Sequence, residues 1–309
     1  MNEIKIFSPG TIANVSCGFD TLGCCLDTVG DEMIIRRSEQ KGVRITKIEG
    51  ERLPHETKNN VAGVAALALL EAYDQPLESG FEIEICKKIK PGSGIGSSAA
   101  SAAGAVFGIN QLLGKPFTAR ELILFASKGE ELVSGYPIAD NVAPALLGGF
   151  TLVKAYDPLK ILQLPVMDDL YAIILHPQIE IKTSESRNIL PEKILLKDAV
   201  KQWAHVGSLV HALHTEDYVL FGNSLHDFII EPYRSKLIPH FGEVVKAAKD
   251  AGALGSGISG SGPSVFTFSK GLQNAETVKN IIIDLYKKTE IPFQVYVSKI
   301  NKGGIKIIN

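Results

Sequence analysis

The sequence has few cysteines and no strong excess of charge, and each shortage argues against a class of protein. Of its 309 residues, four are cysteines: Cys17, Cys24, Cys25 and Cys86. They do not form the CxxC pairs typical of zinc sites, so we interpret them as free thiols in a reducing, cytoplasmic environment. Lys and Arg number 32 against 34 Asp and Glu, a net charge of −2. That balance predicts neither nucleic acid nor an anionic membrane as a partner.

Long apolar runs are also missing. No run approaches the about 20 residues of a transmembrane helix, and residues 1–5 lack the charged-then-apolar pattern of a signal peptide. We therefore expect no secretory leader and no membrane anchor. Hydrophobic residues make up 45% of the chain, which is ample for a large core, and the length suggests two domains.

One glycine-rich stretch stands out against this background. Residues 80–90 alternate apolar and polar side chains, as a half-buried strand does. Pro91-Gly92-Ser93-Gly94-Ile95-Gly96 follows, and residues 97–105 are then all small. The segment ends at Gly114-Lys115-Pro116, a helix-stop signal. The predicted order is strand, glycine loop, helix.

This order favours the binding of an anion. Glycine lets the backbone approach a ligand closely, and a helix start offers unpaired N–H groups and a partial positive charge. Together these features make a phosphate site, to which Ser97 and Ser98 add hydroxyls. The alternative is a tight turn whose small residues only allow close helix packing, and we favour phosphate binding. The spacing differs from that of a P-loop and from the dinucleotide fingerprint.

Polar residues in other segments allow two interpretations each. Residues 8–20 read as a long polar loop, in which Asn14 and Asp20 serve either turns or a substrate's amino group or hydroxyl. Asn60 can cap a helix over residues 61–70. Near the end of a helix capped by Thr118, Glu130-Glu131 would by itself be an ordinary solvated pair.

The second half of the chain offers further polar candidates. Asp140-Asn141 lies in a mostly apolar stretch, where it serves either an Asx-type cap or a site. Arg187 sits early in a helix that Thr183 would cap. The helix dipole does not stabilise a cation at that position, so the presence of Arg187 there favours a functional role. For Arg234 the alternative is a surface arginine, although the neighbouring Pro232 and Tyr233 suggest a fixed position.

Taken together, these motifs resemble the GHMP kinases. Residues 91–100 are similar to the family's Pro-x-x-x-Gly-Leu-Gly-Ser-Ser-Ala loop, with Ile95 in place of Leu and one residue fewer between Pro91 and Gly94, and residues 255–264 resemble its third motif. Residues 140–149, Asp-Asn-Val-Ala-Pro-x-x-x-Gly-Gly, resemble the homoserine kinase branch. That branch usually carries a histidine where this chain has Ile138.

The resemblance implies an α+β fold of two domains. Residues 1–160 would form the GHMP kinase N-terminal ATP-binding domain, similar to domain 2 of ribosomal protein S5 and containing a left-handed βαβ unit. Residues 161–309 would form the C-terminal, ferredoxin-like domain. The periodicity of the sequence supports alternating strands and helices and does not by itself predict that handedness.

The implied activity is an ATP-dependent phosphorylation of the hydroxyl of L-homoserine, with Mg²⁺, on the route to threonine. Two alternatives stay open: a kinase for another small alcohol such as mevalonate, and a catalytically silent nucleotide-binding regulator. Members of the family are commonly dimers, so the resemblance also implies a homodimer.

The resemblance assigns roles to individual residues. Ser98 and Glu130 would hold magnesium, Arg187 and Arg234 the substrate's carboxylate, and Asn14, Asp20 and Asp140 its amino and hydroxyl ends. The catalytic set would be Asp140, Asn141 and Thr183. Asn141 stands where mevalonate kinases have an aspartate base, so we expect no strong protein base. The ATP-binding set would be Asn60, Pro91, Gly92, Ser93, Gly94, Ile95, Gly96, Ser97, Ser98, Ala99, Ala100, Ser101, Gly260 and Ser261.

Overall fold

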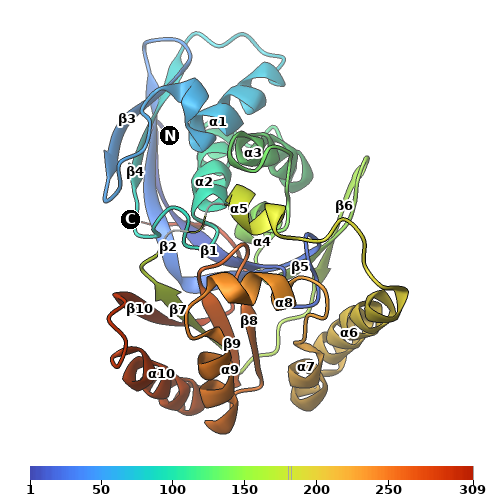
Figure 1. Cartoon of the computed structure of the whole chain (residues 1–309). Helices are drawn as coiled ribbons and strands as arrows, with labels where there is room; N and C mark the ends of the chain where they lie inside the picture. The colour runs from blue at the N-terminus through green and yellow to red at the C-terminus, as the bar shows by residue number, and fades with distance from the viewer. Residues whose placement is uncertain (180, 182, 309) are drawn as a thin grey trace.

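Two sheets, one in each half of the chain, organise the molecule (Figure 1). The computed structural model describes residues 1–179, 181 and 183–308. The first sheet runs in the order β11-β1-β2-β4-β3, with β5 paired to β2 and β6 paired to β5. Its strands are β1 (Glu3–Ala13), β2 (Leu22–Ser38), β3 (Val43–Glu49), β4 (Gly80–Cys86), β5 (Phe150–Tyr156), β6 (Leu159–Leu164) and β11 (Lys306–Ile307).

Helices pack on the first sheet because their apolar side chains meet the apolar face of its strands. Ile35 and Ile83 of the sheet share a core with the alanines of α1, α2 and α3. At Gly104 and Gly108 a Cβ would come within 2.3 Å of Met33 and 2.5 Å of Ile35, so these glycines let α2 lie close to β2. The first-half helices are η1 (Thr57–Asn59), α1 (Val61–Glu71), α2 (Ser97–Leu112), α3 (Ala119–Ser134) and α4 (Val142–Leu147).

The second sheet has the order β10-β7-β9-β8, with every neighbouring pair antiparallel. Along the chain its elements follow as strand, helices, two strands, helix, strand, which is the ferredoxin-like arrangement. The strands are β7 (Leu170–Pro177), β8 (Gly255–Ile258), β9 (Val265–Lys270) and β10 (Phe293–Lys299). The helices are α5 (Thr183–Asn188), α6 (Leu196–Thr215), α7 (Tyr218–Ser224), α8 (Glu231–Arg234), η2 (Ser235–Leu237), α9 (Phe241–Asp250) and α10 (Leu272–Tyr286).

The strand β7 connects the two cores because it is buried on both faces. Ile173 and Leu175 pack into the core under α9 and α10. Ala172 and Ile174 point the other way, into a cluster that also contains Ile12 and Phe150 of the first sheet. The halves of the molecule therefore share one continuous apolar contact. The expected two-domain α+β fold is confirmed.

One detail differs from what the sequence suggested, and the expected domain boundary is not tested by it. The loop expected from Ser8 to Asp20 is wrong in its first part, because β1 passes a bulge between Pro9 and Thr11 and continues to Ala13. The chain changes sheets between β6 and β7, whereas the boundary expected at 160/161 falls inside β6; that boundary stays a prediction. Among the described helices, none has both the length and the apolar character to cross a bilayer.

Candidate active site

A cavity of about 490 Å³ is lined by residues from both halves of the molecule. Its walls include the glycine loop, the end of α3, and α5 and α8. Most residues predicted for the site lie on it: Asn14, Asp20, Asn60, Pro91, Gly92, Gly94, Gly96, Ser97, Ser98, Ser101, Glu130, Asp140, Asn141, Arg187, Arg234, Gly260 and Ser261.

Four other predicted residues do not line this cavity. Ser93, Ile95, Ala99 and Ala100 are buried in the protein, where they support the loop and the first turn of α2. Thr183 begins α5, and its side chain lies outside the described part of the structure.

The glycine loop is held between the two halves by close backbone contacts. Gly94 has a φ of +80°, and a Cβ there would lie 2.5 Å from the carbonyl oxygen of Ser259 in the β8–β9 hairpin. Gly96 has a φ of +67° and is the capping residue directly before α2; a Cβ there would lie 2.0 Å from Oγ1 of Thr11. Because glycine has no side chain to cap the helix, the first N–H groups of α2 are left for a ligand.

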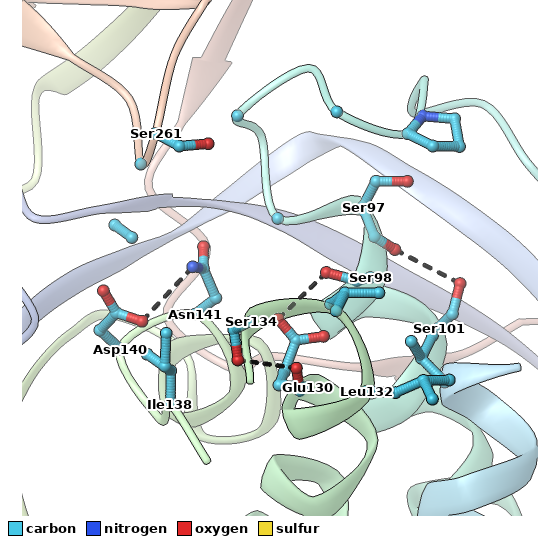
Figure 2. Close-up of a pocket in the computed structure, with 18 of the residues that line it drawn as sticks. Ser97, Ser98, Ser101, Glu130, Leu132, Ser134, Ile138, Asp140, Asn141 and Ser261 are labelled. Carbon is cyan, nitrogen blue, oxygen red and sulfur yellow. Dashed lines mark hydrogen bonds between the residues drawn. The ribbon is translucent and has the colours of Figure 1, made fainter. Parts of the chain in front are cut away.

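Three serines in the first turns of α2 have different partners (Figure 2). Ser98 donates to Oε2 of Glu130 at 3.0 Å, whereas Ser97 donates to the carbonyl oxygen of Ile89 at 2.9 Å. Ser101 donates to the carbonyl oxygen of Ser97 at 3.3 Å. Of these hydroxyls, Ser98 is the one that lies beside a carboxylate.

Glu130 has the burial expected of a ligand-binding carboxylate. Burial raises its pKa to about 7, opposed by the hydrogen bond from Ser98 and by the charge of Lys87. Among the described residues its Oε1 has no hydrogen-bond partner. A carboxylate and a hydroxyl beside a phosphate loop suit Mg²⁺, which takes few protein ligands and completes its shell with phosphate oxygens and water. No cluster of three or more Asp, Glu, His or Cys in the described part could hold a metal.

Lys87 is a cavity residue that the sequence analysis missed. Its Nζ donates to the carbonyl oxygen of Ser97 at 2.9 Å and to Oγ of Ser101 at 3.0 Å, and it pairs with Asp31. The side chains of Lys87 and Asp31 are 1% and 0% exposed. Burial lowers the pKa of Lys87, while Asp31 opposes that shift. A signal was present: Lys87 continues the odd-numbered, buried positions of β4.

Two arginines and an aspartate meet at the other end of the cavity. Arg187 Nη1 and Nη2 donate to the two carboxylate oxygens of Asp20 at 3.1 and 3.2 Å. Arg234 is buried and donates to the carbonyl oxygens of Ser186, at 3.0 Å, and Gly260, at 3.1 Å. The surface alternative for Arg234 is therefore wrong. Burial, and then the charge of Arg187, lower the pKa of Arg234 to about 10.

Asn14 connects this end to the second half of the molecule. Its Nδ2 donates to the carbonyl oxygen of Gly260 at 2.9 Å, and its Oδ1 accepts from the backbone of Asp20 at 3.0 Å. Asn14, Val15 and Ser16 all have positive φ, which is uncommon for side chains other than Asn and Asp. One amide hydrogen and one lone pair of Asn14 stay available for a ligand.

Asp140 and Asn141 lie between the two ends (Figure 2). Thr11, a second residue that we missed, donates to Oδ1 of Asn141 at 2.7 Å and so fixes the amide with its Nδ2 toward Asp140, at 3.4 Å. Burial, together with the charges of Asp20 and Glu130, raises the pKa of Asp140 to about 8. Asn141 can donate and accept hydrogen bonds but cannot take up a proton.

A more apolar wall completes the glycine-loop side. Asn60 caps α1 through Ala62 at 3.0 Å and donates to the carbonyl oxygen of Pro54 at 2.8 Å. Leu53, Pro54 and Val61 line the cavity nearby. A flat, weakly polar group can lie against such a wall while an attached phosphate reaches the start of α2.

Comparisons with known proteins agree with this geometry. Residues 59–149 match the model of the GHMP kinases N terminal domain, and residues 209–288 match that of GHMP kinases C terminal. The chain is 41% identical to the homoserine kinase of Chlorobium phaeovibrioides, over 100% of both chains.

Solved structures show the same similarity. The crystal structure of homoserine kinase from Cytophaga hutchinsonii superposes with a TM-score of 0.95 at 49% identity, over 100% of this chain and 98% of that one. Mevalonate kinase of L. major, in complex with R-mevalonate, has a TM-score of 0.74 at 16% identity, over 96% of each chain. At that identity the second similarity concerns the fold alone.

Proposed function

This chain belongs to the GHMP kinase family, and from that premise we propose that it transfers the γ-phosphoryl group of ATP to the hydroxyl of L-homoserine. The products would be ADP and O-phospho-L-homoserine, an intermediate on the route to threonine. One observation carries the proposal: a single cavity has a phosphate loop at one end and Arg187, Arg234 and Asp20 at the other. The first end suits a nucleoside triphosphate, and the second suits an amino acid.

At the glycine-loop end we assign the nucleotide and its metal ion. The first turn of α2 and the buried cation of Lys87 face the triphosphate, and the wall around Asn60 faces the base. Ser98 and Glu130 would hold Mg²⁺, which neutralises phosphate charge when bound. The free Oε1 of Glu130 supports this assignment.

At the other end the Arg187–Asp20 pair favours a zwitterionic substrate. A carboxylate placed on Arg187 and Arg234 replaces Asp20 as the partner of Arg187. The ammonium group of the same substrate, placed beside Asp20, then replaces Arg187 as the partner of Asp20. A hydroxy acid without an amino group, such as mevalonate, breaks the same pair and leaves Asp20 unpaired, which is costly for a partly buried charge.

The phosphoryl transfer itself depends more on the positions of the reacting groups than on acid–base catalysis. The homoserine oxygen forms a bond to the γ-phosphorus as the bond to the β–γ bridging oxygen breaks, and Asn141 and Asp140 orient the hydroxyl. We propose that no strong protein base removes the hydroxyl proton, which passes to a phosphate oxygen or to solvent. Thr183 keeps its proposed place in the catalytic set.

The absence of a base is tested by single-turnover kinetics of Asp140→Asn and Asp20→Asn at saturating substrates. We expect slower transfer in each variant, with the chemical step still measurable. Abolished chemistry with substrate binding intact, in either variant, would show that the replaced carboxylate is the base.

The function is tested by ADP release from magnesium-ATP with L-homoserine, L-serine, L-threonine and mevalonate side by side. We expect turnover with L-homoserine far above that with the other three. Turnover with mevalonate instead would keep the kinase and overturn the substrate, and no turnover with any alcohol would favour the silent nucleotide-binding regulator.

The metal assignment has a matched control on the same helix. Glu130→Gln should raise the concentration of Mg²⁺ needed for half-maximal activity by at least about tenfold, because an amide is a weaker ligand than a carboxylate. Glu131→Gln changes an exposed neighbour outside the cavity and should leave that concentration unchanged. Equal magnesium dependence in the two variants would remove Glu130 from the metal site.

We also propose a cytoplasmic location and a homodimer. The location rests on the four cysteines, all of which are free. The homodimer rests on the family resemblance alone.

A further inference from the structure

The guanidinium of Arg187 lies close to two aromatic rings. Its central carbon is 4.5 Å from the ring centre of Tyr136 and 5.5 Å from that of Phe19. Tyr136 belongs to the segment between α3 and α4, and Phe19 to the segment between β1 and β2. Arg187 itself comes from α5, which belongs to the second half of the chain and lies beside the first-half helices (Figure 1).

The hydrogen bonds of the Arg187 guanidinium lie at its edge, so its faces are free to contact the aromatic rings. Nη1 and Nη2 of Arg187 point at Asp20, whereas its Nε is buried and has no partner among the described residues. The hydroxyl of Tyr136 is likewise buried without a described partner. Tyr136 therefore contacts Arg187 through its ring, whose electron-rich face attracts the cation.

The position of Tyr136 is set by the helix that carries Glu130. Ser134 donates to the carbonyl oxygen of Glu130 at 2.8 Å and to that of Tyr136 at 2.5 Å, and Figure 2 shows the first of these bonds at the end of α3. Gly135, with a φ of +83°, ends the helix between them. The turn therefore connects the glycine-loop end of the cavity to Arg187.

We propose that Tyr136 is a positioning residue for the substrate. Its ring holds Arg187, across the junction of the two halves, with the Nη1–Nη2 edge directed into the cavity, so that the carboxylate of the substrate meets an arginine already in place. This inference rests on the proposed function, because the substrate is taken to be L-homoserine. Tyr136 does not itself line the cavity, so it acts through Arg187.

The test compares the steady-state kinetics of Tyr136→Phe and Tyr136→Ala. We expect the phenylalanine variant to behave as the wild type, because it keeps the ring and loses only a hydroxyl without a described partner. The alanine variant should raise KM for L-homoserine about tenfold, leave KM for ATP within twofold and change kcat less than KM. A ring that only stabilises the fold would not separate the two KM values in this way.

A control variant removes a tyrosine–cation contact elsewhere. Tyr218 stacks on Lys270 at 4.3 Å, outside the cavity, and Tyr218→Ala should lower Tm without changing KM for L-homoserine. An unchanged KM in Tyr136→Ala, or an equal rise in Tyr136→Phe, would overturn the inference while leaving the kinase intact. If the wild type fails to turn over L-homoserine, the proposed function and this inference both fall.

Discussion

At the scale of single residues, the cavity brings like charges close together. Three carboxylates and three cations take part: Asp20, Glu130, Asp140, Lys87, Arg187 and Arg234. Burial strengthens the repulsion between like charges and penalises each charge that lacks a partner. The site is therefore strained electrostatically until a ligand arrives, and two of its residues allow that strain to be measured.

Asp140 should make the ligand-free protein less stable at high pH. Its folded-state pKa is raised from 3.8 to about 8, so the folded state binds the proton more tightly than the unfolded state does. Stability is then fully present below about pH 4 and falls as the pH rises through the folded pKa. Asp140→Asn removes this ionisation and should stabilise the protein at pH 9 by at least about 1 kcal/mol.

Urea unfolding of the magnesium-free and nucleotide-free protein at pH 6 and pH 9 measures the effect. The gain from Asp140→Asn should be larger at pH 9 than at pH 6. A gain that is equal at both values, or a loss at pH 9, would show that Asp140 is ionised in the folded state without penalty.

Lys87 should contribute to nucleotide binding through its charge. Replacing it alone would leave Asp31 buried and unpaired, a loss of about 3–5 kcal/mol that could prevent folding. The double variant Lys87→Met with Asp31→Asn removes both charges and keeps an acceptor oxygen for the backbone N–H groups of Lys88 and Ile89, which now lie 2.7 and 3.0 Å from Asp31.

We expect this double variant to fold and to bind magnesium-ATP about tenfold more weakly by titration calorimetry, because a buried cation near the phosphates is worth at least about 1.4 kcal/mol there. The single variant Lys88→Met, which removes an exposed cation outside the cavity and leaves Lys87 and Asp31 paired, is the control and should bind nearly as the wild type does. Equal affinity in all three proteins would reduce Lys87 to a structural residue.

At the scale of elements, the β8–β9 hairpin and the glycine loop are hydrogen-bonded to each other, and we call this contact the joint. Ser259 donates to the carbonyl oxygen of Gly94 at 2.7 Å, and the N–H of Ser264 donates to the carbonyl oxygen of Ser93 at 3.2 Å. The hairpin belongs to the second sheet and the loop to the first half. The phosphate loop therefore takes its shape from both parts of the chain.

Gly94→Ala should open this joint. Its Cβ would stand 2.5 and 2.7 Å from the carbonyl oxygens of Ser259 and Gly262, which are backbone atoms and cannot move aside cheaply. We expect a loss of about 2–4 kcal/mol, combining left-handed strain with the clash, together with a higher KM for ATP.

Gly114→Ala is the matched control, because Gly114 has a φ of +89° and no described atom lies within 4 Å of its Cβ position. It should cost about 1 kcal/mol, since it carries only the left-handed strain. Similar losses in the two variants would show that the joint adapts.

The elements also show what the sequence could predict. Periodicity and caps predicted α1, α3 and the succession of β4, the glycine loop and α2, because their signals are local; Thr118 caps α3 as expected. The strand through Ser8–Ala13 was missed because Pro9 and Gly10 read as a turn, and only pairing with β2 overrides that local preference.

For the candidate active site, too, local sequence signals predicted some residues and missed those that depend on tertiary contacts. Gly, Ser and Asn motifs predicted most of the cavity, whereas Lys87 and Thr11 were missed because each acts through a residue distant in sequence. Tyr136 lies four residues before Asp140, yet its partner Arg187 is 51 residues further along, counted from 136 to 187. Contacts between distant segments are set by tertiary packing, which a single sequence does not display.

At the scale of the whole molecule, the two halves should unfold together. The cluster that includes Ile12, Phe150, Ile174 and Phe266 is completely buried and belongs to both halves. The C-terminal strand β11 makes a separate link between the halves by returning to pair with β1, with Ile6 opposite Ile307. Separate unfolding would expose this shared apolar surface, which is unfavourable in proportion to its area.

Differential scanning calorimetry tests this prediction on the intact protein. We expect one transition whose calorimetric and van't Hoff enthalpies agree, as for a two-state unit. Because both halves supply the cavity walls, a non-hydrolysable ATP analogue with Mg²⁺ should shift that whole transition upward. At 100 times its Kd the gain is about 2.7 kcal/mol, or about 4 °C for a chain of this size. Mg²⁺ alone is the control and should have a much smaller effect. Two transitions, with only the earlier or the later one moved by the nucleotide, would show that the halves are independent units and that the joint at Gly94 couples them weakly.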